Sequence, residues 1–261
     1  MKTIAIMNLK GGAGKTTTAI NMAAILATEY GQRVLLIDAD GQRNATKSLL
    51  PMRDGRPELC LSDYLRCEVP GMWRQYIAPS TIRNLDLIPG DTGLWDLELG
   101  QSASKGALAA LCDALIEADA YDYCIVDCPP GFTVGCINAI LASNVVIIPS
   151  PLDGYSDDGA MELIAQINSL RRVSPNVRVG GVLVTMWYKS EQGRLHEALL
   201  RERHHINVYS TVIRRSPKVS ESTYDNGPVL TYSPRSAAAA DYRKFVREFL
   251  AREEALSHGR I

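Results

Sequence analysis

The stretch of sequence that decides the fold reads Lys10-Gly11-Gly12-Ala13-Gly14-Lys15-Thr16-Thr17. A short apolar run at residues 3–8 precedes it, and a helical pattern at residues 15–29 follows. A strand, a glycine-rich loop and a helix in this order form a phosphate-binding P-loop. Glycines let backbone N–H groups converge on phosphate oxygens, and the start of a helix adds unpaired donors. The stretch therefore predicts a nucleoside triphosphate site.

Two side chains of this loop have chemical roles in such a site. Lys15 is placed to bring its ammonium group against the β- and γ-phosphates, and the Thr16 hydroxyl is placed to ligate magnesium. We expect ATP with Mg²⁺ as the ligand. The predicted contacts of the loop with the nucleotide are Lys10, Gly11, Gly12, Ala13, Gly14, Lys15, Thr16 and Thr17.

Short apolar runs alternate with longer helical patterns along the chain of 261 residues. The predicted strands are residues 3–8, 33–37, 85–88, 123–127, 144–148 and 179–185, with a weaker one at 207–210. The predicted helices are residues 15–29, 104–118, 155–172, 191–203 and 236–255. This alternation predicts an α/β fold, a single-domain P-loop NTPase with a mostly parallel twisted sheet and helices on both faces. We expect one domain over residues 1–261, with the helix at 236–255 packed on its body. We assign no element to residues 51–80.

The composition is typical of a globular protein, with 46% apolar residues, 22% charged residues and a net charge of −1. This balance gives no global reason to expect nucleic acid or an anionic membrane as a partner. No stretch has the pattern of a spanning helix or of a signal peptide, so we expect a cytoplasmic protein.

Six cysteines occur along the chain, at Cys60, Cys67, Cys112, Cys124, Cys128 and Cys136. No pair has CxxC spacing and no histidine cluster stands near them, which favours plain reduced thiols. An iron–sulfur ligand at Cys128 or Cys136 is the alternative.

Carboxylates follow two of the predicted strands directly. One apolar run at residues 34–37 delivers Asp38 and Asp40, and another at residues 123–126 delivers Asp127. Ligands of open α/β sheets bind at the carboxyl ends of the strands. Asp38 and Asp40 point the same way if the strand continues through them. Carboxylates that face a triphosphate are repelled by its negative charge unless a metal ion or a water molecule lies between them.

The loop departs from the general P-loop pattern, because Leu9 stands where a glycine is usual and Lys10 adds a second lysine. In this respect it resembles the deviant Walker A motif of the ParA/MinD family of P-loop ATPases. Residues 40–46 are similar to the family's DPQGNAT segment, with Gly41 for the usual proline and Arg43 for the usual glycine. The resemblance covers nearly the whole chain. Further matches are residues 123–131, 182–186, 213–221, 227–229 and 232–236.

The resemblance implies roles for individual residues. Lys10 would reach across a dimer interface to the nucleotide of the other subunit, and Asp40 would orient the attacking water. The catalytic residues it implies are Lys10, Lys15 and Asp40. The magnesium site it implies, direct or through water, consists of Thr16, Asp38 and Asp127. Met186 and Pro217 would border the adenine.

A basic segment distinguishes the carboxyl-terminal half of the chain. Residues 171–218 contain ten lysines and arginines and three acids, whereas the remainder holds 18 basic and 26 acidic residues. Such asymmetry suits contact with a phosphate backbone, although scattered solvated arginines would give the same count. The DNA-binding candidates are Arg214, Arg215 and Lys218, followed by Lys189 and Arg194.

Among the branches of the family, the ParA/Soj type matches best. It implies an ATP-dependent homodimer that binds DNA without sequence preference, and slow ATP hydrolysis stimulated by a ParB-like partner. The alternative is a MinD-like or other positioning ATPase that acts on a membrane or a protein cargo. The last helix carries a single apolar stripe with acids beyond it, so we expect it to pack on the body rather than on lipid.

Overall fold

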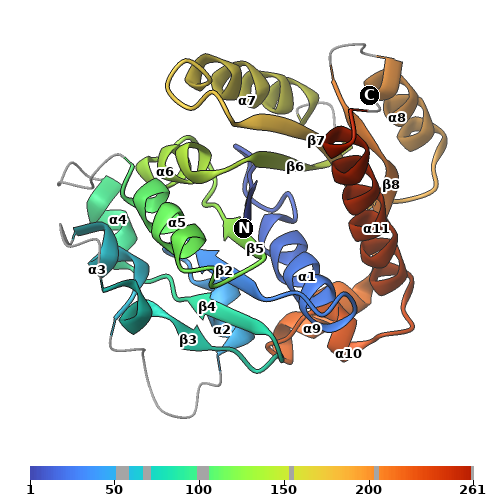
Figure 1. Ribbon diagram of the computed structural model, residues 1–261. Coiled ribbons are helices and arrows are strands. Elements are labelled where there is room, and N and C mark those ends of the chain that lie inside the picture. Colours follow the sequence, from blue (N-terminus) through green and yellow to red (C-terminus); the bar gives the residue numbers. More distant parts are fainter. Residues whose placement is uncertain (51–58, 67–71, 99–105, 153–155, 203–205, 260–261) are drawn as a thin grey trace.

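The computed structural model describes residues 1–50, 59–66, 72–98, 106–152, 156–202 and 206–259 (Figure 1). Eight strands form one sheet in the order β3-β4-β2-β5-β1-β6-β7-β8, parallel except for the β3–β4 pair. The strands are β1 (Lys2–Ile6), β2 (Val34–Asp38), β3 (Ala78–Pro79), β4 (Leu85–Ile88), β5 (Tyr123–Asp127), β6 (Val145–Pro151), β7 (Arg178–Trp187) and β8 (Val208–Arg214).

The sheet is buried on both faces because its central strands are apolar at nearly every position. In β1, Ile4 and Ile6 face one hydrophobic cluster, whereas Ala5 and the following Met7 face the other. Successive side chains of a strand point to opposite faces, so a strand covered on both sides needs an unbroken apolar run. This is the physical reason that the central strands could be predicted from runs rather than from alternation.

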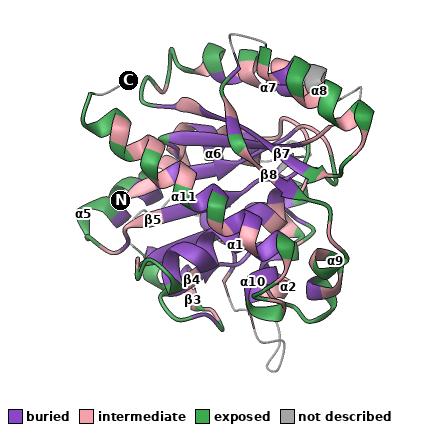
Figure 2. Ribbon diagram, turned by 90° about the vertical axis from the view of Figure 1, so that its right-hand side faces the viewer, coloured by how far each residue is buried: buried purple, intermediate pink, exposed green. Residues whose placement is uncertain are grey.

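Helices cover both faces of the sheet (Figures 1 and 2). One cluster is completed by residues of α1, α2, α10 and α11, and the other by residues of α3 to α8. The helices are α1 (Lys15–Thr28), α2 (Asn44–Leu49), α3 (Leu61–Arg66), α4 (Gly93–Glu98), α5 (Ala107–Glu117), α6 (Val134–Ala142), α7 (Ser156–Leu170), α8 (Glu191–Glu202), α9 (Pro217–Tyr224), α10 (Val229–Tyr232) and α11 (Ala237–Ser257), with a 3-10 turn η1 (Trp73–Tyr76).

The predicted fold class is confirmed. Of the predicted elements, β4 and β5 are found at the predicted bounds and the others with shifted ends. The first strand ends at Ile6 rather than at Asn8, because the Asn8 side chain turns to hydrogen-bond the backbone around it. Short elements were not predicted, namely β3, α2, α3, α4, α6, α9, α10 and η1. Most of them are too short for a helical period to be visible in the sequence. Of residues 51–80, the structure describes α3, η1 and β3, and the remainder lies outside the described residues.

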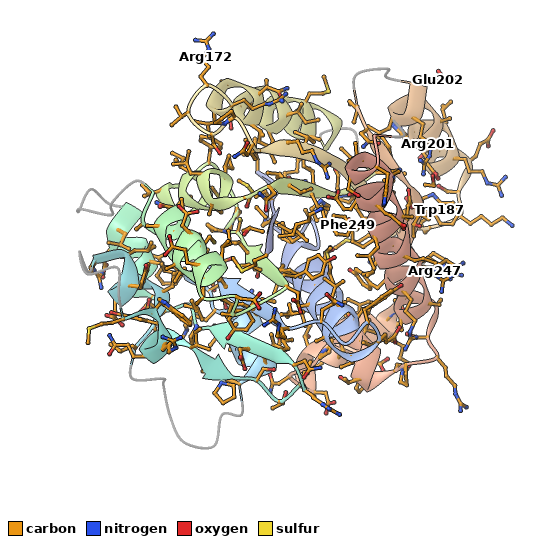
Figure 3. All side chains as sticks on the ribbon, in the orientation of Figure 1. Arg172, Trp187, Arg201, Glu202, Arg247 and Phe249 are labelled. Atoms are coloured by element: carbon orange, nitrogen blue, oxygen red, sulfur yellow. The ribbon has the colours of Figure 1, made fainter. Side chains whose placement is uncertain are left out.

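The last helix, α11, packs along α1 and β8. Its apolar stripe of Tyr242, Phe245, Val246 and Phe249 is buried, and Figure 3 shows Phe249 turned toward the body and Arg247 turned away from it. Near its end, Glu253 accepts hydrogen bonds from Lys2 and Arg178, which join α11 to β1 and β7. No helix in the described part of the chain is long and apolar enough to cross a membrane.

Carboxylates of the same helix cover the free edge of the sheet. The two Glu248 oxygens accept hydrogen bonds from the backbone N–H groups of Ser210 at 2.7 Å and Thr211 at 2.8 Å. Arg252 donates to the Val208 carbonyl at 2.9 Å from the same side. An edge strand with unpaired backbone groups is a template for association with other chains. Here side chains of α11 occupy part of that template.

Candidate nucleotide site

The phosphate loop has the backbone conformation that its glycines permit. Gly12 and Gly14 have positive φ angles of 72° and 88°, and Gly14 is the N-cap of α1. Side chains with a Cβ rarely adopt this region, so these two positions require glycine. The hydroxyl of Thr185, on β7, donates to the Ala13 carbonyl at 2.9 Å and fixes the loop from the side.

The base of the loop is tied to neighbouring strands. The Asn8 amide donates to the Pro149 carbonyl at 2.7 Å, and its oxygen accepts from the Lys10 N–H at 2.9 Å. The N–H of Gly131, in the segment after β5, donates to the Leu9 carbonyl at 2.9 Å. The loop is therefore held in place before any phosphate is bound.

The ammonium group of Lys15 lies inside the loop. Its side chain is buried, and Nζ donates to the Lys10 carbonyl at 2.8 Å. Burial lowers the pKa of Lys15, while the charge of Asp127 opposes this change. A buried ammonium group next to open backbone donors suits a polyanion such as a triphosphate.

Asp38 is the last residue of β2 and is fully buried. Its Oδ2 accepts from the N–H of Thr46 at 2.8 Å and from the Thr46 hydroxyl at 2.7 Å. The same hydroxyl accepts from the Gly90 N–H at 2.9 Å, which connects Asp38 to the loop after β4. Burial raises the pKa of Asp38 to about 6, although the bonds from Thr46 act in the opposite direction.

Asp127 ends β5 directly beside Asp38, its register partner on β2. Both of its carboxylate oxygens are buried and accept no hydrogen bond within the described part of the chain. Burial, followed by the charge of Asp38, raises the pKa of Asp127 well above its usual range, and Thr16 and Lys15 act against this rise. Two adjacent buried carboxylates near a threonine hydroxyl are a donor set that fits Mg²⁺. The residues present therefore suit the ion that the P-loop implies.

Asp40 lies on the loop that follows β2. Asp38 and Asp40 would point the same way only if the strand continued through both, and this condition is not met because β2 ends at Asp38. The backbone turns there instead, and the Asp40 N–H donates to Asp38 Oδ1 at 3.2 Å. Asp40 is 7% exposed, and its Oδ1 accepts from the Gln42 N–H at 2.9 Å. The structure thus brings Asp40 close to the other two carboxylates but on a separate segment.

A pocket of about 590 Å³ opens beside the phosphate loop. Gly14 and Thr17 form one side of it, and Met186 and Pro217, the predicted adenine neighbours, lie in its lining. Met186 has a positive φ of 52°, an uncommon conformation for a residue with a side chain. The pocket therefore lies between the phosphate loop and the segments at 182–186 and 213–221, which the sequence analysis matched to the family.

The predicted DNA-binding residues divide into two groups. Arg214 binds Asp241 of α11 through two hydrogen bonds of 2.7 Å, and Lys218 contacts Glu221 at 2.6 Å. The second group is exposed and has no ion pair within the described ranges. It consists of Lys189, Arg194 and Arg215. Arg214 and Arg215 also line the 590 Å³ pocket. Charge counting alone could not reveal these pairings, because they depend on the tertiary fold.

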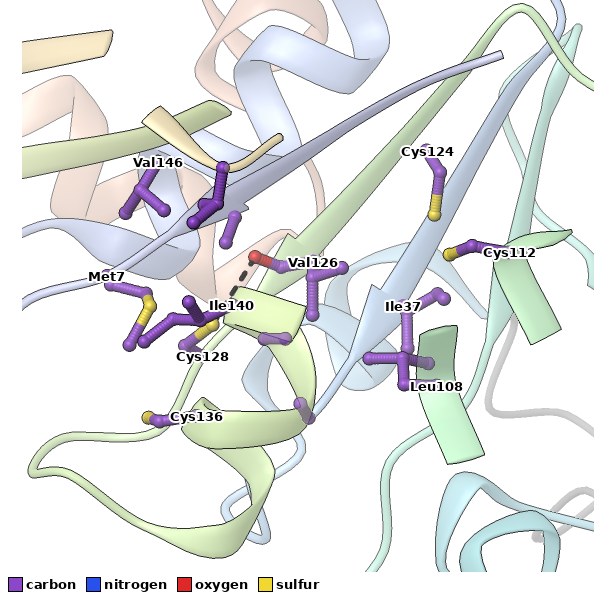
Figure 4. Packing of buried hydrophobic residues seen from close by; sticks show 14 of the residues in the cluster. Met7, Ile37, Leu108, Cys112, Cys124, Val126, Cys128, Cys136, Ile140 and Val146 are labelled. Atoms are coloured by element: carbon purple, nitrogen blue, oxygen red, sulfur yellow. Dashed lines mark hydrogen bonds between the residues drawn. The ribbon is translucent and has the colours of Figure 1, made fainter. Parts of the chain in front are cut away.

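The cysteines that the structure describes, Cys60, Cys112, Cys124, Cys128 and Cys136, are all buried thiols. Figure 4 shows the sulfur atoms of Cys112 and Cys124 facing each other within the core. Cys136 donates to the carbonyls of Pro129 at 3.5 Å and Gly131 at 3.3 Å. Its burial inside the segment after β5 leaves no exposed thiolate for an iron–sulfur cluster at this position.

Three residues with clear structural roles in the site were not predicted. Thr46 orients Asp38, Asn8 anchors the loop, and Thr185 holds the Ala13 carbonyl. A signal existed for Thr46, since it ends the segment similar to DPQGNAT. Thr185 stands next to Met186, but no local pattern places it against the phosphate loop.

A strand, a glycine-rich loop, a helix and carboxylates at the adjoining strand ends define a P-loop nucleoside triphosphate hydrolase. Comparison with known proteins agrees, since residues 1–179 match the family model described as an AAA domain. Over 260 residues the chain is 35% identical to the chromosome partitioning protein ParA of Caulobacter vibrioides, covering 97% of this chain and 95% of that protein. It is 34% identical to the sporulation initiation inhibitor protein Soj of Bacillus subtilis, covering 96% and 98%.

Among solved structures, the apo form of McdA from Cyanothece superposes with a TM-score of 0.79 at 25% identity, covering 96% of this chain and 99% of that chain. McdA also has a structure in complex with ATP. The chain belongs to the ParA/MinD family of P-loop ATPases. It is an ATPase. Another neighbour at 25% identity, a cobyrinic acid a,c-diamide synthase from Mycobacterium smegmatis, was solved with an ATP analogue and magnesium.

Proposed function

We propose that this ATPase is a dimerising switch of the DNA-partitioning type, formed as one domain by residues 1–261. ATP binding produces a homodimer, the dimer binds DNA without sequence preference, and a ParB-like partner stimulates slow hydrolysis. The names of its relatives, a chromosome partitioning ParA and Soj, support this role. The observation that carries it is the loop with two lysines, Lys10 and Lys15, against the buried pair Asp38 and Asp127. The protein acts in the cytoplasm, on the nucleoid.

The site residues have separate tasks in this proposal. Lys15 and the backbone of the loop bind the β- and γ-phosphates, and Lys10 reaches the nucleotide of the other subunit. Asp40 orients the water that attacks the γ-phosphate. Bound magnesium, held by Thr16, Asp38 and Asp127 directly or through water, neutralises charge on the phosphates. Met186 and Pro217 border the adenine in the 590 Å³ pocket.

Slow turnover follows from the residues that are present. Positioning and charge neutralisation supply most of the catalysis of phosphoryl transfer, and no strong base accompanies Asp40 among the described residues around the loop. A slow hydrolysis step leaves the ATP-bound state populated until a partner accelerates it. This property suits a switch better than a metabolic enzyme.

The DNA contacts we propose are Lys189, Arg194 and Arg215, with Arg214 and Lys218 beside them. The first three have no acidic partner within the described ranges, so their charges are available to phosphate groups without breaking an ion pair. Arg214 is anchored by Asp241 and contributes a fixed charge. Each phosphate contact that is removed lowers the dependence of DNA affinity on salt by about one unit of slope.

The experiment that tests the function measures retention of unrelated DNA duplexes against salt concentration, with ATP and Mg²⁺ or with ADP. We expect binding only with ATP, similar for all sequences, and a flatter salt dependence for Arg194→Ala with Arg215→Ala. Arg83→Ala, an exposed arginine before β4 at the opposite end of the sheet, is the matched control. Absence of ATP-dependent binding at low salt would contradict the DNA role and indicate a positioning ATPase that acts on a protein cargo.

A further inference from the structure

The indole of Trp95 lies against the backbone of the loop that carries Asp40. Trp95 belongs to α4, and Gly41 follows Asp40 directly. A Cβ on Gly41 would lie 2.7 Å from Cδ1 and from Cε2 of the indole, and closer still to Nε1. Real Cβ atoms do not approach other atoms so closely. The position of Trp95 therefore depends on the absence of a side chain at Gly41.

The segment between β4 and α4 makes a second close approach to the same loop. A Cβ on Gly90 would lie 2.6 Å from the Asp38 carbonyl oxygen and 3.0 Å from the Asp40 carbonyl oxygen. The Gly90 N–H also donates to Thr46, which holds the Asp38 carboxylate. The chain from Gly90 to Trp95 thus contacts the carboxylate loop on its backbone at both aspartates.

The carboxylate loop is held in part by its own backbone. The Ala39 N–H donates to the Asp127 carbonyl at 2.9 Å, and the Arg43 N–H donates to the Asp40 carbonyl at 2.9 Å. The hydrogen bonds of the Asp40 side chain and amide are local, to Gln42 and Asp38. Arg43, which ends the loop, has a positive φ of 60° that costs a residue with a Cβ about 1 kcal/mol. A short loop with a strained residue keeps one conformation only where surrounding groups impose it. At Gly41, the neighbouring group is the indole of Trp95.

We propose that Trp95 is a positioning residue for ATP hydrolysis, which holds the loop through Gly41 and thereby fixes the Asp40 carboxylate toward the attacking water. The inference rests on the proposed role of Asp40. Trp95 is 42% exposed, and its indole lies against Gly41. The resemblance to the family supplies no such contact, because a proline is usual at the position of Gly41 and would collide with the indole.

The effect should fall on turnover rather than on ATP binding. In the proposed mechanism Asp40 acts on the water, whereas the phosphates are bound by the P-loop and Lys15, and the indole of Trp95 lies against the loop of Asp40. A displacement of a catalytic group by about 1 Å can lower a rate about 100-fold. We therefore expect Trp95→Ala to lower kcat about 10- to 100-fold while KM for ATP stays within about twofold.

Four variants test this proposal by steady-state ATPase assays: Trp95→Ala, Trp95→Phe, Gly41→Ala and the double variant Gly41→Ala with Trp95→Ala. Trp95→Phe should recover much of the lost kcat, because a ring again covers Gly41. Gly41→Ala should lower kcat by displacing the indole. Adding it to Trp95→Ala should cause little further loss, since coupled residues are not additive. Tyr30→Ala, which removes a ring that is 40% exposed at the end of α1, should leave kcat unchanged.

Asp40→Ala, measured in parallel, separates the two claims. If Asp40→Ala retains full turnover, the proposed role of Asp40 fails. If Asp40→Ala loses turnover while Trp95→Ala keeps kcat within about twofold of the parent, the positioning role of Trp95 fails alone. Thermal denaturation of every variant identifies loss of fold. Independent, additive losses in the double variant would also overturn the proposal.

Discussion

At the scale of single residues, the carboxylates at the ends of β2 and β5 oppose folding in the absence of ligand. Burial raises the pKa of Asp38 to about 6 and raises that of Asp127 further from its usual range. An unfolded aspartate titrates near pH 4. Between about pH 4 and pH 6 the unfolded chain therefore loses protons that the folded chain keeps, so folding stability falls as the pH rises.

Removing one of these charges should stabilise the nucleotide-free protein. We predict that Asp127→Asn raises the free energy of unfolding at pH 7 by about 1–3 kcal/mol, because a buried carboxyl group whose ionised form is disfavoured by burial is replaced by a neutral amide. Urea denaturation measures this change, and Mg²⁺-dependent ATP binding should be lost in the same variant. Asp122→Asn is the control, and it should lower the free energy of unfolding, because Arg33 stabilises the ionised form of Asp122 and lowers its pKa. Equal or lower stability of Asp127→Asn would contradict the account.

The same raised pKa values predict that binding of ATP with Mg²⁺ releases protons. Asp38 is partly protonated near pH 6 in the free protein, and a carboxylate must be ionised to engage the metal or its water shell. Affinity for ATP with Mg²⁺ should therefore increase from pH 5 to pH 7. Calorimetry in buffers of different ionisation enthalpy counts the protons released. A heat of binding that is independent of the buffer at pH 6 would be the opposing result.

Arg43 presents a different residue-scale cost. Its φ of 60° stands where the related segment has glycine, so Arg43→Gly should stabilise the protein by about 1 kcal/mol. Asn84→Gly is the matched control at a φ of 62°, and its gain should be smaller because asparagine tolerates this conformation better. Chemical denaturation compares the two variants. A gain at Asn84 that equals or exceeds the gain at Arg43 would refute the strain explanation.

At the scale of elements, α11 protects the edge strand β8. Glu248→Ala should lower the free energy of unfolding by about 1–3 kcal/mol, because two backbone N–H groups lose their acceptor. It should also increase self-association, which light scattering detects. The pKa of Glu248 is lowered in the fold despite its burial, so this contribution is present above the unfolded pKa and is lost as the pH falls through the folded pKa. Glu254→Ala, an exposed glutamate of the same helix, should change neither quantity.

The elements that could be predicted from the sequence are those with a strong local signal. The central strands are continuous apolar runs, and α1 begins where the glycine-rich loop ends. By contrast, α2 and α10 have only six and four residues, and their positions are decided by packing against α1.

In the candidate site too, residues of local motifs could be predicted from the sequence, whereas residues that act through distant contacts could not. The phosphate loop and the aspartates after β2 and β5 belong to local motifs, and the structure brings them together. Thr185 and Trp95 act through contacts with residues 172 and 54 positions earlier in the chain, at Ala13 and Gly41. No local pattern encodes such distances. The pairing of Arg214 with Asp241 was missed for the same reason.

At the scale of the whole molecule, the ATP site combines both halves of the chain. The phosphate loop comes from the first 17 residues, whereas the pocket beside it is closed by β7, by the segment after β8 and by Tyr242 of α11. The ion pairs of Glu253 with Lys2 and Arg178 fasten α11 across the first strand. ATP bound in this pocket would therefore contact the segments that carry Arg214 and Arg215. This arrangement connects the nucleotide state with the proposed DNA surface.

In the proposed switch, ATP joins two copies of this chain through Lys10. The most direct measurement is the molar mass by light scattering of Asp40→Ala with ATP and Mg²⁺, compared with the same protein that also carries Lys10→Ala. We predict a stable dimer for Asp40→Ala, because ATP is bound but not hydrolysed, and a monomer once Lys10 is removed. Lys244→Ala, an exposed lysine of α11, should leave the dimer intact. A dimer that persists without Lys10, or a monomer with Asp40→Ala under saturating ATP, would contradict the account.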